Sequence, residues 1–317
     1  ASNGMSSGVE FADAEFIAGW LALTRLNEPE TALDHFRKLE AGVSTPVSLS
    51  RAKYWQGRAA EGANDLELAR ERFTAAAQHV TAYYGQLALL ALGPDAAEID
   101  LPPDPVITEA DREAFHARPE ITAIRLLAEI DADYLFRVFM YHFDDEMQTD
   151  AEQAMLADIA TEFLRVREQV RAAKAARMQG TTLATRAYPV ISLPSDAPVF
   201  PEAALTHSVI RQETEFHQQA VSRAGARGIM QMMPATARAT ARDLGVQYNY
   251  EWLTDDTDYN LRLGMAHLNE VVEEYDGSLV MALAAYNAGG HRVDQWVDRY
   301  GDPRTGEIDP IDWVESI

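Results

Sequence analysis

Cysteine is absent from the 317 residues, which excludes a disulfide framework, a thiolate nucleophile and any zinc site that uses cysteine. Basic residues are few: 27 Lys+Arg stand against 50 Asp+Glu, for a formal net charge of −23. A field of that sign repels phosphate backbones and anionic lipid surfaces, so we expect no nucleic-acid partner. No run approaches the roughly 20 apolar residues that a membrane span needs, so we expect no span.

Hydrophobic residues make up 47% of the chain, enough for the cores of two or three domains. Through residues 11–93 they recur at helical spacing between Gly and Pro interruptions, which predicts helical hairpins. Three residues also recur in order, offset by 38, 37 and 37 positions: Gly19, Ala32 and Phe36, then Gly57, Ala69 and Phe73. Tetratricopeptide-like helix pairs have about this period. Such an array either binds protein or glycan on a concave surface or only buries its own faces, and the sequence favours neither.

Helical patterns continue through residues 106–180, where Thr108 is a candidate helix cap. The basic residues that follow suit the C-terminal end of a helix, and we interpret them as a solvated face: Arg165, Arg167, Arg171, Lys174 and Arg177. Prolines then forbid a continuous helix over 187–201, at Pro189, Pro194, Pro198 and Pro201. We therefore expect an all-α chain with a helical repeat domain over 1–94, a helical linker domain over 95–195 and a compact helical domain over 196–317.

The last of these domains contains the candidate chemistry. Spacing places Leu205, Val209 and Phe216 on one face of a helix that ends near Glu213. A single Glu in a helix is usually a solvated surface residue, so Glu213 alone is a weak candidate. A Gly-rich loop and a Met-rich run, residues 222–233, follow it. If apolar side chains surround Glu213, desolvation raises its pKa toward neutrality, as a general acid requires.

Three motifs now occur in order: S-V-I-R-Q-E-T-E-F from Ser208, A-V-S-R-A-G-A-R-G-I-M-Q-M-M-P-A-T-A from Ala220, and A-A-Y-N-A-G from Ala284. In order and spacing they resemble the soluble lytic transglycosylases, whose catalytic domain is similar to goose-type lysozyme. Residues 84–89 are similar to the family's superhelical and linker domains. The resemblance implies a tetratricopeptide-like superhelix, linker helices and a lysozyme-like catalytic domain over 196–317.

Carried over by position, the resemblance makes Glu213 the catalytic residue, with Thr214 in place of the usual Ser. It implies that substrate-binding residues are Ser222, Gln231, Met233, Tyr286, Asn287 and Glu315. Tyr286 is expected to hydrogen-bond Glu213. The similarity ends at the V-E-S-I segment, before a stretch that normally follows in the family, so we expect an incomplete sugar groove.

The implied reaction cleaves the β-1,4 bond between N-acetylmuramic acid and N-acetylglucosamine in peptidoglycan, giving 1,6-anhydromuramyl products without water. Glu213 would act as acid and then as base, and neither a metal nor a cofactor is called for. Expected partners are peptidoglycan glycan strands and muropeptides, with other cell-wall enzymes as further candidates. The substrate implies the periplasm. Since the first residues lack a signal-peptide pattern, we expect a processed or trimmed chain.

Two alternatives stay open. A second carboxylate that positions water would favour a lysozyme-like hydrolytic muramidase. Glu215 points to another side of the helix, and the remote candidates are Glu273, Glu274, Asp276 and Glu315. A non-catalytic periplasmic scaffold or glycan-binding protein would instead use the helical repeats. The intact R-Q-E motif argues against that second alternative.

Overall fold

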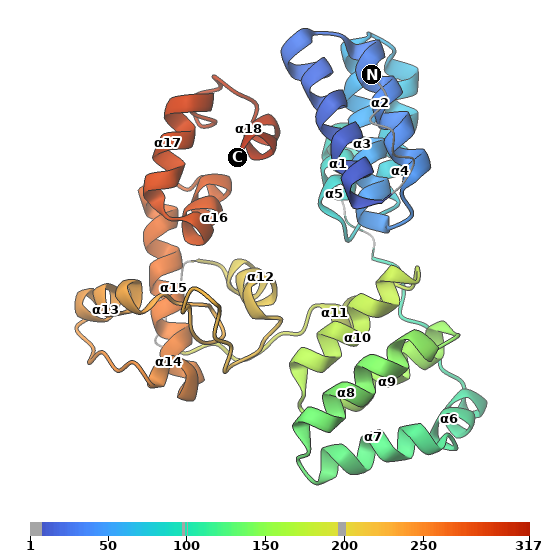
Figure 1. Ribbon diagram of the computed structural model, residues 1–317, viewed down its shortest axis with the longest axis vertical. Helices are drawn as coiled ribbons and strands as arrows, with labels where there is room; N and C mark the ends of the chain where they lie inside the picture. Colours follow the sequence, from blue (N-terminus) through green and yellow to red (C-terminus); the bar gives the residue numbers. More distant parts are fainter. Residues whose placement is uncertain (1–7, 97–98, 100, 196–200) are drawn as a thin grey trace. The chain divides into compact units, whose positions relative to one another are not determined.

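The computed structural model describes residues 8–96, 99, 101–195 and 201–317 (Figure 1). Across these ranges the regular elements are helices, apart from two isolated antiparallel bridges, Val221–Arg227 and Arg227–Met232. Pro198, part of the expected domain boundary, lies among 196–200, outside the described residues. The chain divides into two compact units, residues 1–107 with 174–184, and residues 108–173 with 185–317. No helix in the described ranges combines the length and apolarity of a membrane span.

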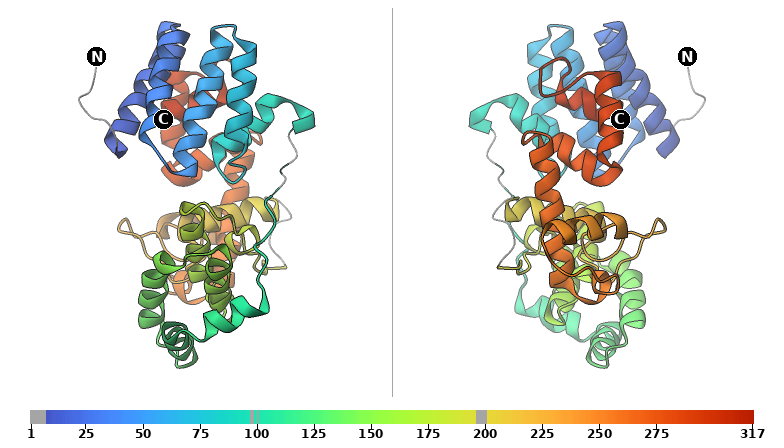
Figure 2. Two further views of the ribbon diagram at one scale, coloured as in Figure 1. Left: turned by 90° about the vertical axis from the view of Figure 1, so that its right-hand side faces the viewer. Right: turned by 90° about the vertical axis from the view of Figure 1, so that its left-hand side faces the viewer.

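The first unit is a succession of antiparallel helices, drawn blue to cyan in Figures 1 and 2. Its elements are α1 (Val9–Leu21), the π-helical η1 (Ala22–Leu26), α2 (Pro29–Gly42), α3 (Pro46–Gly62), α4 (Leu66–Ala77), α5 (Tyr83–Leu92) and the 3₁₀ turn η2 (Pro94–Ala96). Each of the helices α1 to α5 packs against the next in sequence. The predicted helical hairpins are therefore confirmed.

The sequence repeat corresponds to a repeated packing contact. A Cβ atom on Gly19 would lie 2.7 Å from Phe36 Cε1, and one on Gly57 would lie 2.5 Å from Phe73 Cε1. Both phenylalanine rings are buried, so each aromatic ring of one helix occupies the space that a glycine leaves on the preceding helix. The glycine–aromatic pair is thus a steric requirement of each hairpin.

The second unit begins with linker helices. They are α6 (Glu109–His116), α7 (Pro119–Glu129), α8 (Asp133–Phe143), the 3₁₀ turn η3 (Asp144–Glu146), α9 (Asp150–Glu162), α10 (Val166–Met178) and α11 (Ala184–Ala187). Residues 174–184, which include the end of α10 and the first residue of α11, belong to the first unit. Thr108 caps α6 as predicted: its hydroxyl accepts from the Asp111 backbone N–H at 3.2 Å, and the Asp111 carboxylate accepts from the Thr108 N–H at 2.9 Å.

The basic cluster differs from our interpretation. Helix α10 begins at Val166, after the left-handed Leu164 (φ 56°), so Arg165 and Arg167 lie at the start of a helix and not at its C-terminal end. The cluster is also not simply a solvated face. Arg165 pairs with two aspartates of the preceding hairpin, and Arg171 pairs with Glu215 at 3.1 Å. Tertiary contacts with acidic groups hold these side chains in place.

The remainder of the second unit packs around one long helix, α15 (Thr257–Glu274). Helices α13 (Pro234–Asp243) and α14 (Trp252–Asp255) contact α15 near one end, and α16 (Leu279–Ala288), followed by α17 (Gly290–Tyr300), packs at the other (Figure 1). Helices α12 (Ala203–Thr214) and α18 (Pro310–Ser316) complete this part. Its buried core includes Ile210, Met230, Leu268, Met281 and Trp313.

Candidate active site

Glu213 lies in the last turn of α12. The helix ends in two successive left-handed residues, Glu215 (φ 52°) and Phe216 (φ 68°), a conformation that side chains other than glycine adopt at a cost. Phe216 is buried in the core and Glu215 pairs with Arg171, which together hold this turn. The end of α12 is therefore anchored by the two residues that follow Thr214, and Glu213 is left free to face elsewhere.

The Glu213 carboxyl group lines a cavity of about 300 Å³ between two helical stripes. The α12 stripe consists of Leu205, Ser208, Val209, Gln212 and Glu213, and the α16 stripe of Leu283, Tyr286 and Asn287. Both sets follow the i, i+3, i+4 spacing of one helix face. Sequence reasoning placed Glu213, Tyr286 and Asn287 at the site but missed Ser208, Gln212 and Leu283, for which this spacing was the available signal.

Burial raises the pKa of the Glu213 carboxyl above its ordinary value of 4.5. Its carboxylate forms no ion pair or hydrogen bond with the rest of the described chain, so nothing offsets the loss of hydration of the charged form. Leu205, Val209 and Leu283 supply the apolar surroundings. The group is therefore biased toward the protonated state from which a general acid acts.

Tyr286 lies beside Glu213, but the expected hydrogen bond between them is not formed. The Tyr286 hydroxyl donates instead to the Met230 carbonyl oxygen at 2.8 Å. Burial, followed by the negative charge of Glu213, raises the pKa of Tyr286 well above its ordinary value, so the phenol stays protonated. Tyr286 thus ties α16 to the Met-rich run and closes one wall of the cavity.

The Gly-rich loop is held to the rest of the site by side-chain hydrogen bonds to its backbone. Thr214 Oγ1 donates to the Ile229 carbonyl at 2.8 Å, joining the last turn of α12 to the loop. Buried Asn260, on α15, accepts from the Met230 N–H at 3.0 Å and donates to the Arg227 and Leu253 carbonyls at 3.0 and 2.9 Å. These bonds satisfy backbone groups that would otherwise be buried unpaired.

Gly228 is a position where this loop tolerates no side chain. Its φ is +77°, and a Cβ there would lie 2.0 Å from the Leu253 carbonyl oxygen and 2.2 Å from Asn260 Nδ2. Both the backbone conformation and the close approach therefore require glycine.

The other predicted substrate-binding residues do not line this cavity. Ser222 closes the Gly-rich loop, its hydroxyl accepting from the Ala226 N–H at 3.0 Å. Gln231 donates its side-chain amide to the Gly228 carbonyl at 2.9 Å. Met233 is exposed just before α13, and Glu315 is partly buried on α18. In this structure, the hydrogen bonds of Ser222 and Gln231 therefore shape the Gly-rich loop.

No second carboxylate lines the Glu213 cavity among the described residues. Glu215 pairs with Arg171, and Asp276 pairs with Arg304 at 2.8 Å. Glu273 accepts from the Asn269 side chain at 2.8 Å. Nor does the described part of the chain group three or more His, Asp or Glu side chains in an arrangement that could hold a metal ion.

Comparison with known proteins assigns this region. Residues 201–308 match the family model described as the transglycosylase SLT domain. We call this segment the SLT domain after that match. It contains Glu213, the Gly-rich loop, Asn260 and Tyr286.

Curated relatives match about a third of the chain. A Haemophilus influenzae relative is 37% identical over 110 residues, which are 35% of this chain and 18% of that protein. The soluble lytic murein transglycosylase of Escherichia coli K12 is 32% identical over 111 residues, 35% of this chain and 17% of that protein. The matched stretch thus makes up less than a fifth of the length of each of these relatives.

Solved structures match almost all of the chain in fold. The 70 kDa soluble lytic transglycosylase from Escherichia coli aligns with a TM-score of 0.69 at 21% identity, over 96% of this chain and 48% of that one. An inactive mutant of lytic transglycosylase Slt from Pseudomonas aeruginosa aligns with a TM-score of 0.70 at 22% identity. The alignment covers 95% of this chain and 51% of that one. The chain therefore spans about half of each. These matches confirm the predicted fold class, an all-α superhelix and linker helices followed by a lysozyme-like SLT domain.

Proposed function

We propose that this chain is a lytic transglycosylase that cleaves the β-1,4 bond between N-acetylmuramic acid and N-acetylglucosamine in peptidoglycan. One observation carries the proposal: a half-buried, unpaired carboxyl group with a raised pKa lines a cavity in an SLT domain, with no second carboxylate beside it among the described residues. The names of the relatives identify murein as the substrate class.

In the proposed reaction, the protonated Glu213 carboxyl donates its proton to the glycosidic oxygen, and the bond from that oxygen to C1 of the muramyl sugar breaks. Positive charge develops on the muramyl ring, as in other glycosidases, and the sugar's own N-acetyl group stabilises C1. The N-acetylglucosamine side leaves as an alcohol. Glu213 is now an ionised carboxylate in apolar surroundings, which favour its taking a proton back.

The second step uses the hydroxyl on C6 of the same muramyl sugar. Glu213 takes the proton of this hydroxyl while its oxygen bonds to C1, and the product is a 1,6-anhydro ring. Atoms balance without water, and Glu213 returns to its protonated state. A well-oriented intramolecular hydroxyl reaches an effective concentration of roughly 10⁵ M or more, so it outcompetes water when the cavity holds the ring in place.

Other residues would support Glu213 in this scheme. Tyr286 and Asn287 face the same cavity and would contact the sugar there, whereas Ser222 and Gln231 would act by shaping the loop. Met233 and Glu315 would contact sugars further along a groove. Peptidoglycan as substrate makes the periplasm the proposed location, with other wall enzymes as candidate partners.

Mass spectrometry of purified peptidoglycan digested by the protein tests the proposal. Anhydromuramyl ends, lighter than reducing ends by one water, are the expected products. Reducing ends would instead support a hydrolytic muramidase. If neither product forms under conditions where the protein is folded, the non-catalytic scaffold or glycan-binding alternative gains.

A further inference from the structure

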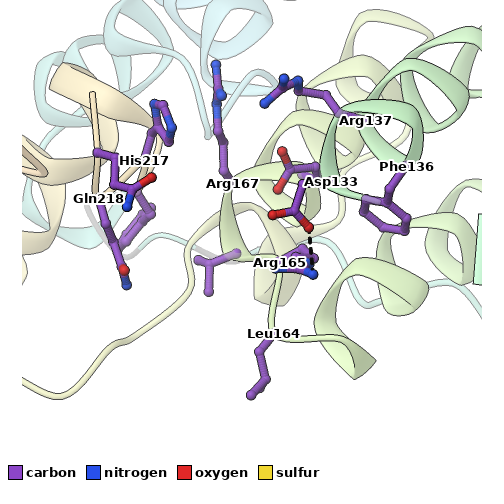
Figure 3. Close-up of a pocket in the computed structure, with 12 residues that line it drawn as sticks. Asp133, Phe136, Arg137, Leu164, Arg165, Arg167, His217 and Gln218 are labelled. Atoms are coloured by element: carbon purple, nitrogen blue, oxygen red, sulfur yellow. Dashed lines mark ion pairs between the residues drawn. The ribbon is translucent and has the colours of Figure 1, made fainter. Parts of the chain in front are cut away.

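A second cavity, of about 220 Å³, lies in the unit that contains the SLT domain, beside the segment that follows α12. The linker region contributes Asp133, Arg137, Arg165 and Arg167, and the segment after α12 contributes His217 (Figure 3). Phe216 lines the same cavity. The proposed cleavage reaction uses none of these side chains.

The cavity lining is cationic in a strongly acidic protein. It holds three arginines against Asp133 and Glu168, a formal balance of 3 − 2 = +1 with His217 neutral, whereas the whole chain carries −23. Arg165 is already paired with Asp133 at 2.7 Å, the ion pair drawn dashed in Figure 3, and with Asp131, outside the lining, at 2.9 Å. The remaining arginines, Arg137 and Arg167, form no ion pair within the described chain.

Arg167 and Arg137 act together on His217. Burial, followed by the positive charges of Arg167 and then Arg137, lowers the pKa of the His217 imidazole. The Nε atom of Arg167 is buried and has no hydrogen-bond partner in the described chain. Two guanidinium groups that line one cavity and form no ion pair in the described chain make a site that an anion would stabilise.

We propose that this cavity binds the terminal carboxylate of a short peptide. A guanidinium group presents parallel N–H donors that match a carboxylate. One carboxylate carries a single negative charge, which balances the net charge of the cavity lining. A phosphate dianion carries more negative charge than that, and it would lie beside the acidic side chains of Asp133 and Glu168. The volume lies below the roughly 300–1,000 Å³ of pockets for drug-sized ligands, so the cavity accommodates the end of a chain. The side-chain amides of Gln218 and Gln219, both exposed at the cavity, are available to peptide groups next to the carboxylate.

The test uses the whole protein and three probes: N-acetyl-alanyl-alanine, its C-terminal amide and inorganic phosphate. Binding is followed by calorimetry and by the Hε1 NMR resonance of His217, assigned with His217→Asn. We expect the peptide acid to shift this resonance saturably, and the amide to leave it unchanged. No enzymatic turnover is measured, so failure of this inference is distinguishable from failure of the proposed glycan cleavage.

Matched variants locate the site. Arg167→Gln and Arg137→Gln are each expected to weaken binding of the peptide acid about tenfold or more, because each removes a charged hydrogen-bond donor. Arg112→Gln, an exposed arginine on α6, is expected to leave binding unchanged. Circular dichroism confirms that each variant is folded, and the comparison of acid with amide needs no variant at all. Equal binding of acid and amide, equal or tighter binding of phosphate, or equal weakening by Arg112→Gln would each overturn the proposal.

Discussion

Glu213→Gln is the substitution that most directly tests the active site. Gln keeps the size and shape of the side chain but can neither donate nor take the catalytic proton. A general acid or base contributes typically 10²–10⁴-fold to a rate. Because no other carboxylate among the described residues lines the cavity, both proton transfers are lost together. We expect kcat/KM for release of anhydromuropeptides to fall by on the order of 10⁴ or more.

Glu215→Gln is the matched control, two residues further along the chain. It removes a carboxylate that pairs with Arg171 at 3.1 Å but does not line the cavity. A partly exposed ion pair of this kind contributes about 0–1 kcal/mol to stability. We therefore expect activity within a few-fold of wild type. Retention of activity within tenfold in Glu213→Gln, or an equal loss in Glu215→Gln, would refute the assignment of Glu213.

The same Glu213→Gln variant has a predicted effect on stability that depends on pH. Burial raises the folded-state pKa of Glu213 above 4.5, so the ionised form is less favourable in the folded protein than in the unfolded chain. The resulting penalty is absent below the unfolded pKa, appears as the pH rises, and is complete above the folded pKa. Glu213→Gln should therefore raise the free energy of unfolding at pH 7 relative to wild type, and this gain should disappear at pH 4 and below. Urea unfolding at several pH values measures it; a gain independent of pH would contradict the burial argument.

Three other substitutions test the packing that surrounds or precedes the site. Gly228→Ala places a Cβ 2.0 Å from the Leu253 carbonyl oxygen at positive φ. We expect urea unfolding to show a loss of about 3 kcal/mol or more in the free energy of unfolding. A loss below about 1 kcal/mol would contradict the steric argument. Tyr286→Phe removes the donor to the Met230 carbonyl; thermal unfolding should show a loss of about 1–3 kcal/mol, with a smaller fall in activity than in Glu213→Gln. Gly57→Ala forces a Cβ against the Phe73 ring and should lower the free energy of unfolding by about 1–3 kcal/mol. In a double-mutant cycle, Phe73→Leu in the same chain should partly relieve this loss. Additive effects of the two changes would count against that contact.

Local sequence signals determined much of the fold. The cap at Thr108 lies where the sequence placed it. The proline that opens α13 and the left-handed Gly245 that follows it are further features set by residue type. Apolar residues at helical spacing between Gly and Pro interruptions predicted the helical hairpins. These features depend on backbone conformation and hydrogen bonds within a few residues, which residue type and spacing specify directly. Glu213 became the candidate acid through the resemblance of its motif to the soluble lytic transglycosylases, since a single helical Glu is a weak candidate by itself.

Only the tertiary structure decided which helix faces meet. The sequence could state that apolar neighbours would raise the pKa of Glu213, but the packing of α12 against α16 determined that Leu283 and Tyr286 supply them. It also determined that Tyr286 donates to Met230 and that Arg167 faces His217 across a second cavity. Desolvation and long-range hydrogen bonding depend on atoms distant in sequence, and spacing along one helix carries no information about the partner on another.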